Sequence, residues 1–249
     1  MTSLARARQS EIARHIDAGG QAIVSELAKR FSVSEMTIRR DLRALEDQGL
    51  AVRVHGGALA AEKSRFSNRL SSNLRLKAKA IGKLSGFIPD RGCVYLDGST
   101  TMLNLVKHFK GRAGLNVVTN NVETFNRLAS LPGPTPLLLG GGLDLRTDNL
   151  IGPLAIRSVG SLAFDVAFFS AWGLDAATGL NEVTVEDAEV KEHVARRARA
   201  VRVAVDHTKI GVTAGGVWNH DSGKAVLATD LAPGNPSLAP FAGMFKRII

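Results

Sequence analysis

Hydrophobic residues recur at every third or fourth position through much of the first fifty residues, which is the spacing of a helix that buries one side. The pattern predicts three short helices, over Leu4–Ala18, Ile23–Phe31 and Ser34–Gly49. Only Ser32 and Val33 separate the second helix from the third. Two short helices joined by so tight a turn are typical of a helix-turn-helix.

The third predicted helix has a divided surface. Ser34 is a good N-cap because its hydroxyl can accept a backbone N–H bond of the first turn, and Gly49 supplies the left-handed position that ends a helix. The apolar side is expected to consist of Met36, Ile38, Leu42 and Leu45. The rest of the surface carries Arg39, Arg40 and Arg43. The polar side of this helix is therefore basic.

A short alternation typical of a β-strand follows the third helix. It runs from Leu50 through Arg53 to His55 and ends at Gly56-Gly57. We expect it to form the wing of a winged helix, in which the recognition helix lies in the major groove and a basic wing touches the flanking backbone. An ordinary helical hairpin with solvated arginines would account for the two helices but not for the wing.

The polar segment Ala60–Ser72 has little apolar periodicity and is expected to be a linker. The predicted organisation is therefore a DNA-binding domain over residues 1–59, a linker over 60–73 and a second domain over 74–249. In the second domain, helices are expected over Leu74–Phe87, Thr101–Phe109, Val122–Leu131, Pro153–Leu162 and Val185–Ala200. Apolar strands are expected over Cys93–Leu96, Leu115–Val118, Pro136–Leu139, Val166–Phe169, Val201–Val205 and Ala225–Ala228. This alternation predicts an α/β fold with a mostly parallel sheet covered on both faces.

The residues that follow the first three of these strands are small and polar. They are Asp97, Ser99, Thr100 and Thr101, then Thr119 and Asn120, then Gly140 and Gly141. Ligands of open α/β sheets bind beyond the carboxyl ends of the strands, and free N–H groups at helix starts favour an anion such as phosphate. Such residues are also common helix caps, so one loop alone would mean little. Three loops at one edge favour a phosphate site.

Composition agrees with a DNA-binding protein. The net charge is +9, and residues 1–75 hold 13 lysine and arginine residues against 8 aspartate and glutamate residues. A basic balance by itself only suggests a polyanionic partner. The single cysteine, Cys93, excludes an intramolecular disulfide and a metal site built on several cysteines, and we expect neither a metal nor another cofactor. No run is long enough to span a membrane and no signal peptide is apparent, so a soluble, cytoplasmic protein without a membrane partner is expected.

The helix and wing resemble a known family. The run VSEMTIRRDLRALEDQGLAVRVHGGA is similar to the signature VSxxTIRRDLxxLExxGxxxRxHGGA of the DeoR family of bacterial transcriptional regulators. The resemblance covers residues 6–58 and implies a winged helix-turn-helix that binds a double-stranded DNA operator. The residues expected to contact DNA are Ser34, Met36, Thr37, Arg39, Arg40, Arg43, Arg53 and His55.

Residues 74–249 resemble the DeoR-type effector domain, which is similar in fold to ribose-5-phosphate isomerase and glucosamine-6-phosphate deaminase. The matching motifs are LDGSTT, VVTNN, LLLGG with Gly152, FDVAFFSAWGLD and VAVDHTKIG. The chain departs from the family pattern at Ser99, at Asp187, where a glutamate is usual, and at Ala171-Trp172. The resemblance implies a phosphorylated sugar or polyol as effector, and it adds Gly152, Lys191 and Lys209 to the loop residues as the expected effector site. Asp97 is expected to contact a ligand hydroxyl, because two anions repel.

The function expected from these patterns is a repressor of carbohydrate metabolism genes that acts as a homo-oligomer, a dimer or a tetramer. The alternative is an active sugar-phosphate isomerase or deaminase with a DNA-binding appendage, since Asp97, Asp175, Glu182, Asp187 and Asp206 could supply a base. The loop SAWGLDAATG lacks the acidic cluster that such enzymes use, so no enzymatic activity and no catalytic residue are expected. A third possibility is that the second domain only dimerises.

Overall fold

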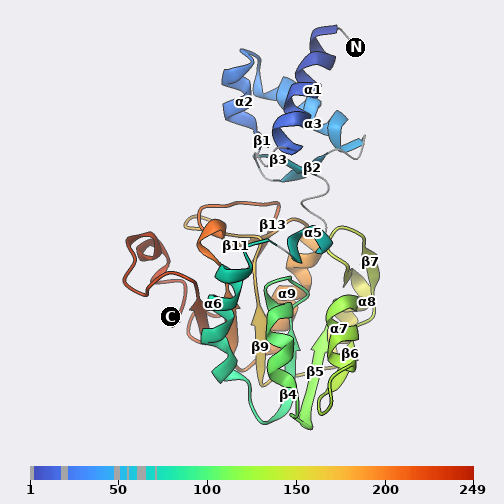
Figure 1. Ribbon diagram of the computed structural model, residues 1–249, viewed down its shortest axis with the longest axis vertical. Helices are drawn as coiled ribbons and strands as arrows, with labels where there is room; N and C mark the ends of the chain where they lie inside the picture. The colour runs from blue at the N-terminus through green and yellow to red at the C-terminus, as the bar shows by residue number, and fades with distance from the viewer. Residues whose placement is uncertain (1–2, 18–21, 48–50, 55, 61–65, 71) are drawn as a thin grey trace. The chain divides into compact units, whose positions relative to one another are not determined.

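The computed structural model describes residues 3–17, 22–47, 51–54, 56–60, 66–70 and 72–249 (Figure 1). The chain forms two compact units, Met1–Arg69 and Leu70–Ile249. Residues 61–65 and 71 of the expected linker lie outside the described residues, and so do Gly49 and His55. The described part of the linker contains a short helix, α5 (Phe66–Leu70).

The first unit contains the three expected helices and a small sheet. The helices are α1 (Ser3–Asp17), α2 (Val24–Arg30) and α3 (Glu35–Asp47). The strands are β1 (Ala22–Ile23), β2 (Ala51–Val54) and β3 (Gly57–Ala60), paired antiparallel in the order β1-β3-β2. Ile23 therefore begins no helix but lies in a strand, and a Cβ at Gly57 would lie 2.1 Å from the carbonyl oxygen of Ala22. The glycine pair allows this close approach of β1 to the wing.

The expected apolar side of α3 is wrong at one residue. Ile38, Leu42 and Leu45 are buried in the core of the first unit, but Met36 is 74% exposed. At 100° per residue, Met36 lies about 200° from Ile38 and shares a side with Arg40 and Arg43. Met36 therefore lies on the basic surface of α3.

A seven-stranded parallel sheet forms the centre of the second unit. Its order is β15-β14-β12-β9-β4-β5-β6, and every neighbouring pair is parallel. The strands are β4 (Arg91–Leu96), β5 (Gly114–Thr119), β6 (Thr135–Leu138), β9 (Val166–Phe169), β12 (Val201–Ala204), β14 (Ala225–Ala228) and β15 (Arg247–Ile248). The α/β fold with a parallel sheet is confirmed.

Helices cover both faces of this sheet (Figure 1). One face carries α6 (Leu74–Leu84), η2 (Met102–Phe109) and α7 (Val122–Ala129), and the other carries α8 (Pro153–Gly160) and α9 (Val185–Arg197). Three short 3₁₀ segments are η1 (Ser85–Phe87), η3 (His207–Lys209) and η4 (Pro236–Phe241). The segment η2 is itself a 3₁₀ helix, although its apolar spacing predicts only a helix of unspecified type.

Two small antiparallel sheets were missed from the sequence. One is the hairpin of β7 (Gly142–Asp144) and β8 (Asn149–Ile151). The other joins β10 (Gly173–Asp175), β11 (Gly179–Glu182) and β13 (Gly216–Trp218). Both follow carboxyl ends of the main sheet, and they position residues of the candidate site.

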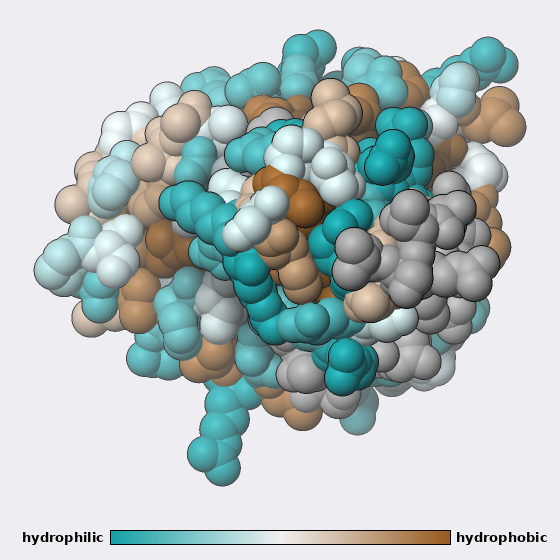
Figure 2. All heavy atoms as spheres, turned by 90° about the horizontal axis from the view of Figure 1, so that it is seen from above, coloured by the Kyte–Doolittle hydropathy of each residue, from teal (hydrophilic) through white to brown (hydrophobic). Residues whose placement is uncertain are grey.

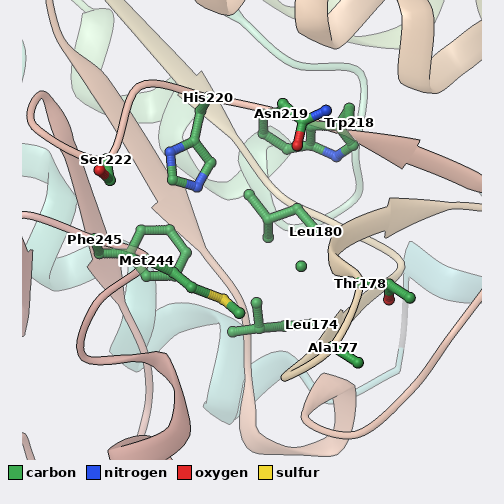
Figure 3. A pocket seen from close by; sticks show the side chains of 11 residues that line it. Leu174, Ala177, Thr178, Leu180, Trp218, Asn219, His220, Ser222, Met244 and Phe245 are labelled. Atoms are coloured by element: carbon green, nitrogen blue, oxygen red, sulfur yellow. The ribbon is translucent and has the colours of Figure 1, made fainter.

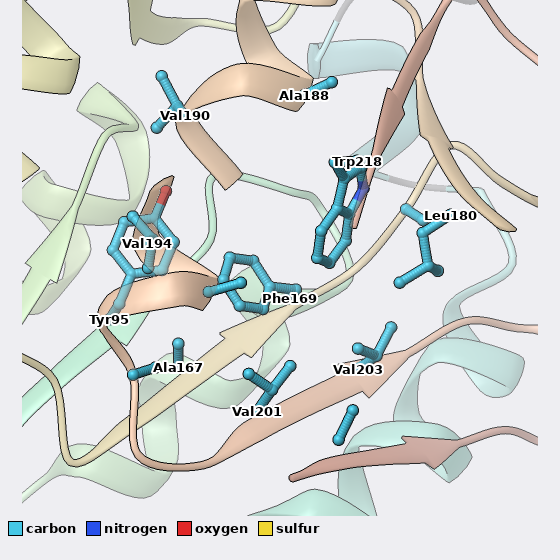
Figure 4. Close-up of a cluster of buried hydrophobic side chains, with 14 of the residues drawn as sticks. Tyr95, Ala167, Phe169, Leu180, Ala188, Val190, Val194, Val201, Val203 and Trp218 are labelled. Carbon is cyan, nitrogen blue, oxygen red and sulfur yellow. The ribbon is translucent and has the colours of Figure 1, made fainter. Parts of the chain in front are cut away.

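Aromatic rings link the main parallel sheet to the small sheet of β10, β11 and β13 (Figure 4). Tyr95 on β4 lies 5.5 Å from Phe169 on β9, and Phe169 lies 5.0 Å from Trp218 on β13, measured between ring centroids. All three side chains are buried. The packing fixes the loops after β4 and β9 relative to β13.

Hydrophilic side chains predominate on the face seen in Figure 2, and hydrophobic ones are scattered in small groups there. Among the described residues, no helix is both long and apolar enough to cross a bilayer.

Candidate functional site

The start of α3 is capped as expected. Ser34 Oγ accepts the backbone N–H of Thr37 at 3.2 Å and lies 2.9 Å from Thr37 Oγ1. This cap satisfies a donor that the first turn leaves open, so it fixes where α3 begins. Both side chains remain near the surface at the amino end of the helix.

Six of the eight expected DNA contacts surround one hollow of about 320 Å³. They are Met36, Thr37, Arg39, Arg40, Arg43 and Arg53. Arg39 bonds to Glu35 at 3.2 Å, and Arg53 on the wing bonds to Glu46 at 2.7 Å. Because both pairs are exposed, they orient the arginines without adding much stability. The helix and the wing thus present one continuous basic surface.

A buried carboxylate on the inner side of α3 anchors that helix. Asp41 is 2% exposed and accepts hydrogen bonds from Arg8 at 2.6 Å and Gln9 at 2.8 Å, both on α1. Burying a charge is tolerated when it is paired and hydrogen-bonded in this way. Arg8 and Gln9 therefore hold α3 against α1.

In the second unit, Lys191 on α9 lies at the centre of a buried charge cluster. Its ammonium donates to Glu182 at 2.5 Å, to the Ser170 carbonyl oxygen at 2.9 Å and to Asp97 at 3.3 Å. Asp97 Oδ2 also accepts the backbone N–H of Ser170 at 3.0 Å. An ammonium has three donors, and these three partners match them. Lys191 ties the loops after β4, β9 and β11 together.

Burial perturbs the acids of this cluster. It raises the pKa of Glu182 to about 7, although the nearby Lys191 opposes the rise. Burial also raises the pKa of Asp187, which accepts hydrogen bonds from Asn149 at 3.0 and 3.2 Å. The neighbouring carboxylates raise the pKa of Lys191 against the effect of its burial. In the part of the chain that the structure describes, no three His, Cys, Asp or Glu side chains are grouped to hold a metal.

Glu182 should make stability depend on pH. Its pKa in the folded protein is above its ordinary value of 4.5, so the folded state binds the proton more tightly than the unfolded state. The free energy of unfolding should fall by about 1 to 3 kcal/mol as pH rises from about 4.5 to 7. Urea denaturation across this range should show that fall in the parent and a flatter curve in Glu182→Gln. The control Glu186→Gln, an exposed residue on α9, should follow the parent, and an unchanged slope in Glu182→Gln would contradict the assignment.

A second buried lysine donates a hydrogen bond to the loop after β4. Lys77 on α6 is 3% exposed, and its ammonium donates to Thr100 Oγ1 at 3.1 Å and to Ser72 Oγ at 3.4 Å. In the same loop, Ser99 Oγ accepts the backbone N–H of Met102, the first residue of η2. The hydroxyl groups of the loop after β4 therefore already lie beside a buried positive charge, the Lys77 ammonium.

Lys77 is not among the expected effector residues, because it lies within the predicted helix over Leu74–Phe87 and not in a loop that follows a strand. Lys77 in fact lies three, four and seven residues before Ala80, Ile81 and Leu84, which are buried. A lysine on the apolar side of a helix is the sequence signal that could have identified it.

The loop after β5 is held firmly against its neighbours. Thr119 and Asn120 are fully buried, and Asn120 Oδ1 accepts the hydroxyl of Tyr95 at 2.9 Å. A Cβ at Gly98 would lie 2.0 Å from Asn149 Oδ1 and 2.6 Å from the Cβ of Asn121. Such contacts leave room only for glycine, and they bring the ends of β4, β5 and β8 together.

The three expected glycines lie at the β7–β8 hairpin and the start of α8. Gly140 follows β6, Gly141 has φ of 150°, and Gly152 has φ of 86° at the N-cap of α8. A Cβ at Gly141 would lie 2.8 Å from the Ile151 carbonyl oxygen. The backbone therefore favours glycine at Gly141 and Gly152, whereas a Cβ at Gly140 would meet only Ser158 Oγ, at 3.4 Å.

Lys209 belongs to η3, which follows the carboxyl end of β12. Its ammonium lies 4.8 Å from the ring centroid of Trp172, a cation–π contact. The neighbouring Thr208 Oγ1 accepts a hydrogen bond from Asn73 at 3.2 Å. The unusual tryptophan of the fourth loop is thus paired with one of the expected effector lysines.

Comparison with known proteins agrees with this two-part organisation. A DeoR-like helix-turn-helix domain model matches residues 8–64, and a DeoR C terminal sensor domain model matches residues 72–224. The HTH-type transcriptional regulator GolR of Listeria innocua is 32% identical over 209 residues, which cover 82% of each chain. The glycerol-3-phosphate regulon repressor of Escherichia coli is 29% identical over 207 residues, again covering 82% of each chain.

Among solved structures, ribose 5-phosphate isomerase A of Methanocaldococcus jannaschii shows a distant likeness. The TM-score is 0.42 and the identity 16%, with 56% of this chain and 55% of the isomerase covered. A likeness at this level has no bearing on activity.

Proposed function

The chain belongs to the DeoR family of transcriptional regulators, and from this membership we propose that a phosphorylated sugar or polyol controls its binding to operator DNA. As a member, it is a DNA-binding regulator rather than an enzyme. One relative is named for the regulon of glycerol 3-phosphate, which is itself a phosphorylated polyol. That name supports an effector of this chemical class and a role in carbohydrate metabolism.

The observation that carries the effector proposal is the buried contact between Lys77 and Thr100. A lysine ammonium beside hydroxyls at the carboxyl edge of a parallel sheet suits a phosphate, because it neutralises charge where the loop offers donors. Ser99, Thr100 and Thr101 would hold the phosphate oxygens. Lys209, at the end of β12, would add a second positive charge.

The ligand's hydroxyl groups would be held by Asp97. Its Oδ1 lies near Lys191 but accepts no hydrogen bond from any residue that the structure describes. A carboxylate oxygen in that state is a suitable acceptor for a sugar or polyol hydroxyl. Lys191 would act through Asp97 and Glu182 by fixing their positions, so the balancing charge for phosphate is assigned to Lys77 and Lys209 instead.

The proposal is tested by thermal shift with a panel of phosphorylated sugars and polyols. A ligand that binds only the folded state at a hundred times its Kd adds about 2.7 kcal/mol, so Tm should rise by several degrees. Thr100→Val should lose the shift produced by the best compound, and the unphosphorylated form of that compound should produce none. Equal shifts in the parent and in Thr100→Val would place the phosphate elsewhere.

Communication with DNA would begin at the first residues of the second unit. Ser72 and Asn73 are the third and fourth residues of the second unit. Ser72 is bonded to Lys77, which contacts the loop after β4, and Asn73 is bonded to Thr208 in the loop after β12. A phosphate that drew the Lys77 ammonium toward Thr100 would weaken its long bond to Ser72. The chain leading from the DNA-binding unit would then be held differently with and without effector, which is what allosteric control requires.

We also propose that the protein acts as a homo-oligomer. One winged helix contacts only a short half-site, and symmetric oligomers match palindromic operators. Sedimentation equilibrium at micromolar concentration should give at least twice the 26.5 kDa chain mass. A monomer both with and without operator DNA would refute this part of the proposal.

A further inference from the structure

A separate pocket lies between the sheet of β10, β11 and β13 and the C-terminal segment that contains Met244 and Phe245 (Figure 3). Its volume is about 260 Å³, and its walls include Leu174, Leu180, Trp218, His220, Met244 and Phe245. His220 stacks on Phe245 with ring centroids 4.9 Å apart, and the ring of Trp218 meets His220 edge-on at 6.1 Å. None of the expected effector residues lines this pocket.

The lining carries no formal charge. Among the described residues around the pocket there is no lysine, arginine, aspartate or glutamate. Burial lowers the pKa of His220, which favours the neutral form of its imidazole. An ionised ligand would lose part of its hydration here without gaining a partner of opposite charge. The site therefore disfavours sugar phosphates and other anions.

Two polar atoms of wall residues, Trp218 Nε1 and His220 Nδ1, lack a partner among the described residues. Trp218 is only 1% exposed, and its Nε1 donates to no residue that the structure describes. Figure 3 shows this nitrogen on the side of the indole that faces Leu180 and the pocket. A buried N–H without an acceptor costs on the order of 1 to 3 kcal/mol, which a ligand oxygen could recover.

We propose that this pocket binds a small uncharged molecule with an apolar ring and at least one hydroxyl group. The ring would lie against His220 and Phe245, and the hydroxyl oxygen would accept the Trp218 N–H. Apolar walls with a few convergent polar groups are the usual composition of a small-molecule site. The volume restricts the occupant to a single ring with short substituents, which is smaller than a disaccharide or a nucleotide.

Phenol and benzoate are matched probes for this site, because they share a ring and differ in charge at pH 7. Isothermal calorimetry on the full chain should show saturable binding of phenol and at least tenfold weaker binding of benzoate. Trp218→Phe should weaken phenol binding at least tenfold, because it removes the indole donor but keeps a ring. Trp172→Phe makes the same change in the other tryptophan and should leave phenol affinity unchanged.

A second variant tests the proposal independently in case Trp218→Phe does not fold. Ala177 lines the pocket at its exposed rim, so Ala177→Phe should narrow the opening and also weaken phenol binding without touching the core. The proposal is overturned if phenol gives no saturable heat, if benzoate binds equally well, or if Ala177→Phe binds phenol as the parent does. Retained effector response in Ala177→Phe would show that this site is distinct from the phosphate site.

Discussion

Replacing Arg39 and Arg40 together by alanine is expected to weaken operator binding at least tenfold while leaving the fold intact. Both side chains are exposed on α3 and face the same hollow as Arg43 and the wing residue Arg53. An arginine that contacts a base contributes roughly 1 to 3 kcal/mol and determines specificity at one position. Removing an arginine that contacts phosphate weakens binding to all sequences alike. It also lowers the slope of log affinity against log salt concentration by about 1.

The measurement is fluorescence anisotropy with a labelled duplex selected from a random pool by the parent protein. Arg127→Ala removes an exposed, singly paired arginine from α7 in the second unit and serves as the control, with affinity unchanged. Circular dichroism establishes that the double variant is folded. If that folded variant binds the selected duplex as tightly as the parent, α3 is not the recognition helix.

Replacing Lys77 by methionine is expected to abolish the response to effector, with at least a tenfold loss of effector affinity. The substitution keeps most of the side-chain volume but removes the buried ammonium that bonds to Thr100. A charge-assisted hydrogen bond of this kind is worth about 1.5 to 3 kcal/mol. Operator affinity without effector should shift toward that of the effector-saturated parent, because the substitution also removes the bond from Lys77 to Ser72.

Lys79→Met is the matched control, since Lys79 is an exposed lysine on the same helix. It should bind both operator and effector as the parent does. The measurement is the effector concentration that produces half of the maximal change in operator affinity. It is compared among the parent, Lys77→Met and Lys79→Met. Equal values for Lys77→Met and the parent would remove Lys77 from the site.

The sequence predicted the main elements because their signals are local. Ser34 caps α3 through its own first turn, and the short apolar strands β9 and β14 begin and end where the alternation with helices places them. Strands buried on both faces are nearly continuous runs of apolar residues, so they are recognisable without knowledge of their neighbours. The family motif of the helix and wing reinforced the same interpretation.

What the sequence did not predict depends on contacts between distant segments. The strand β1 has two residues and exists through its pairing with Ala58 and Gly57. The partners of Lys191 come from β4, β9 and β11, so a single helix sequence could not distinguish a saturated buried lysine from a ligand-binding one. Lys77 differs, because its place on the apolar side of α6 can be recognised from the sequence alone.

The central claim is that one protein joins operator binding to sensing of a phosphorylated sugar or polyol. It is tested most directly by titrating the selected duplex with the parent protein, with and without the compound that raises Tm most. The account predicts that this compound changes operator affinity at least tenfold in one direction, and that Thr100→Val shows the parent's affinity without the change. An operator affinity that is the same with and without saturating compound would contradict it.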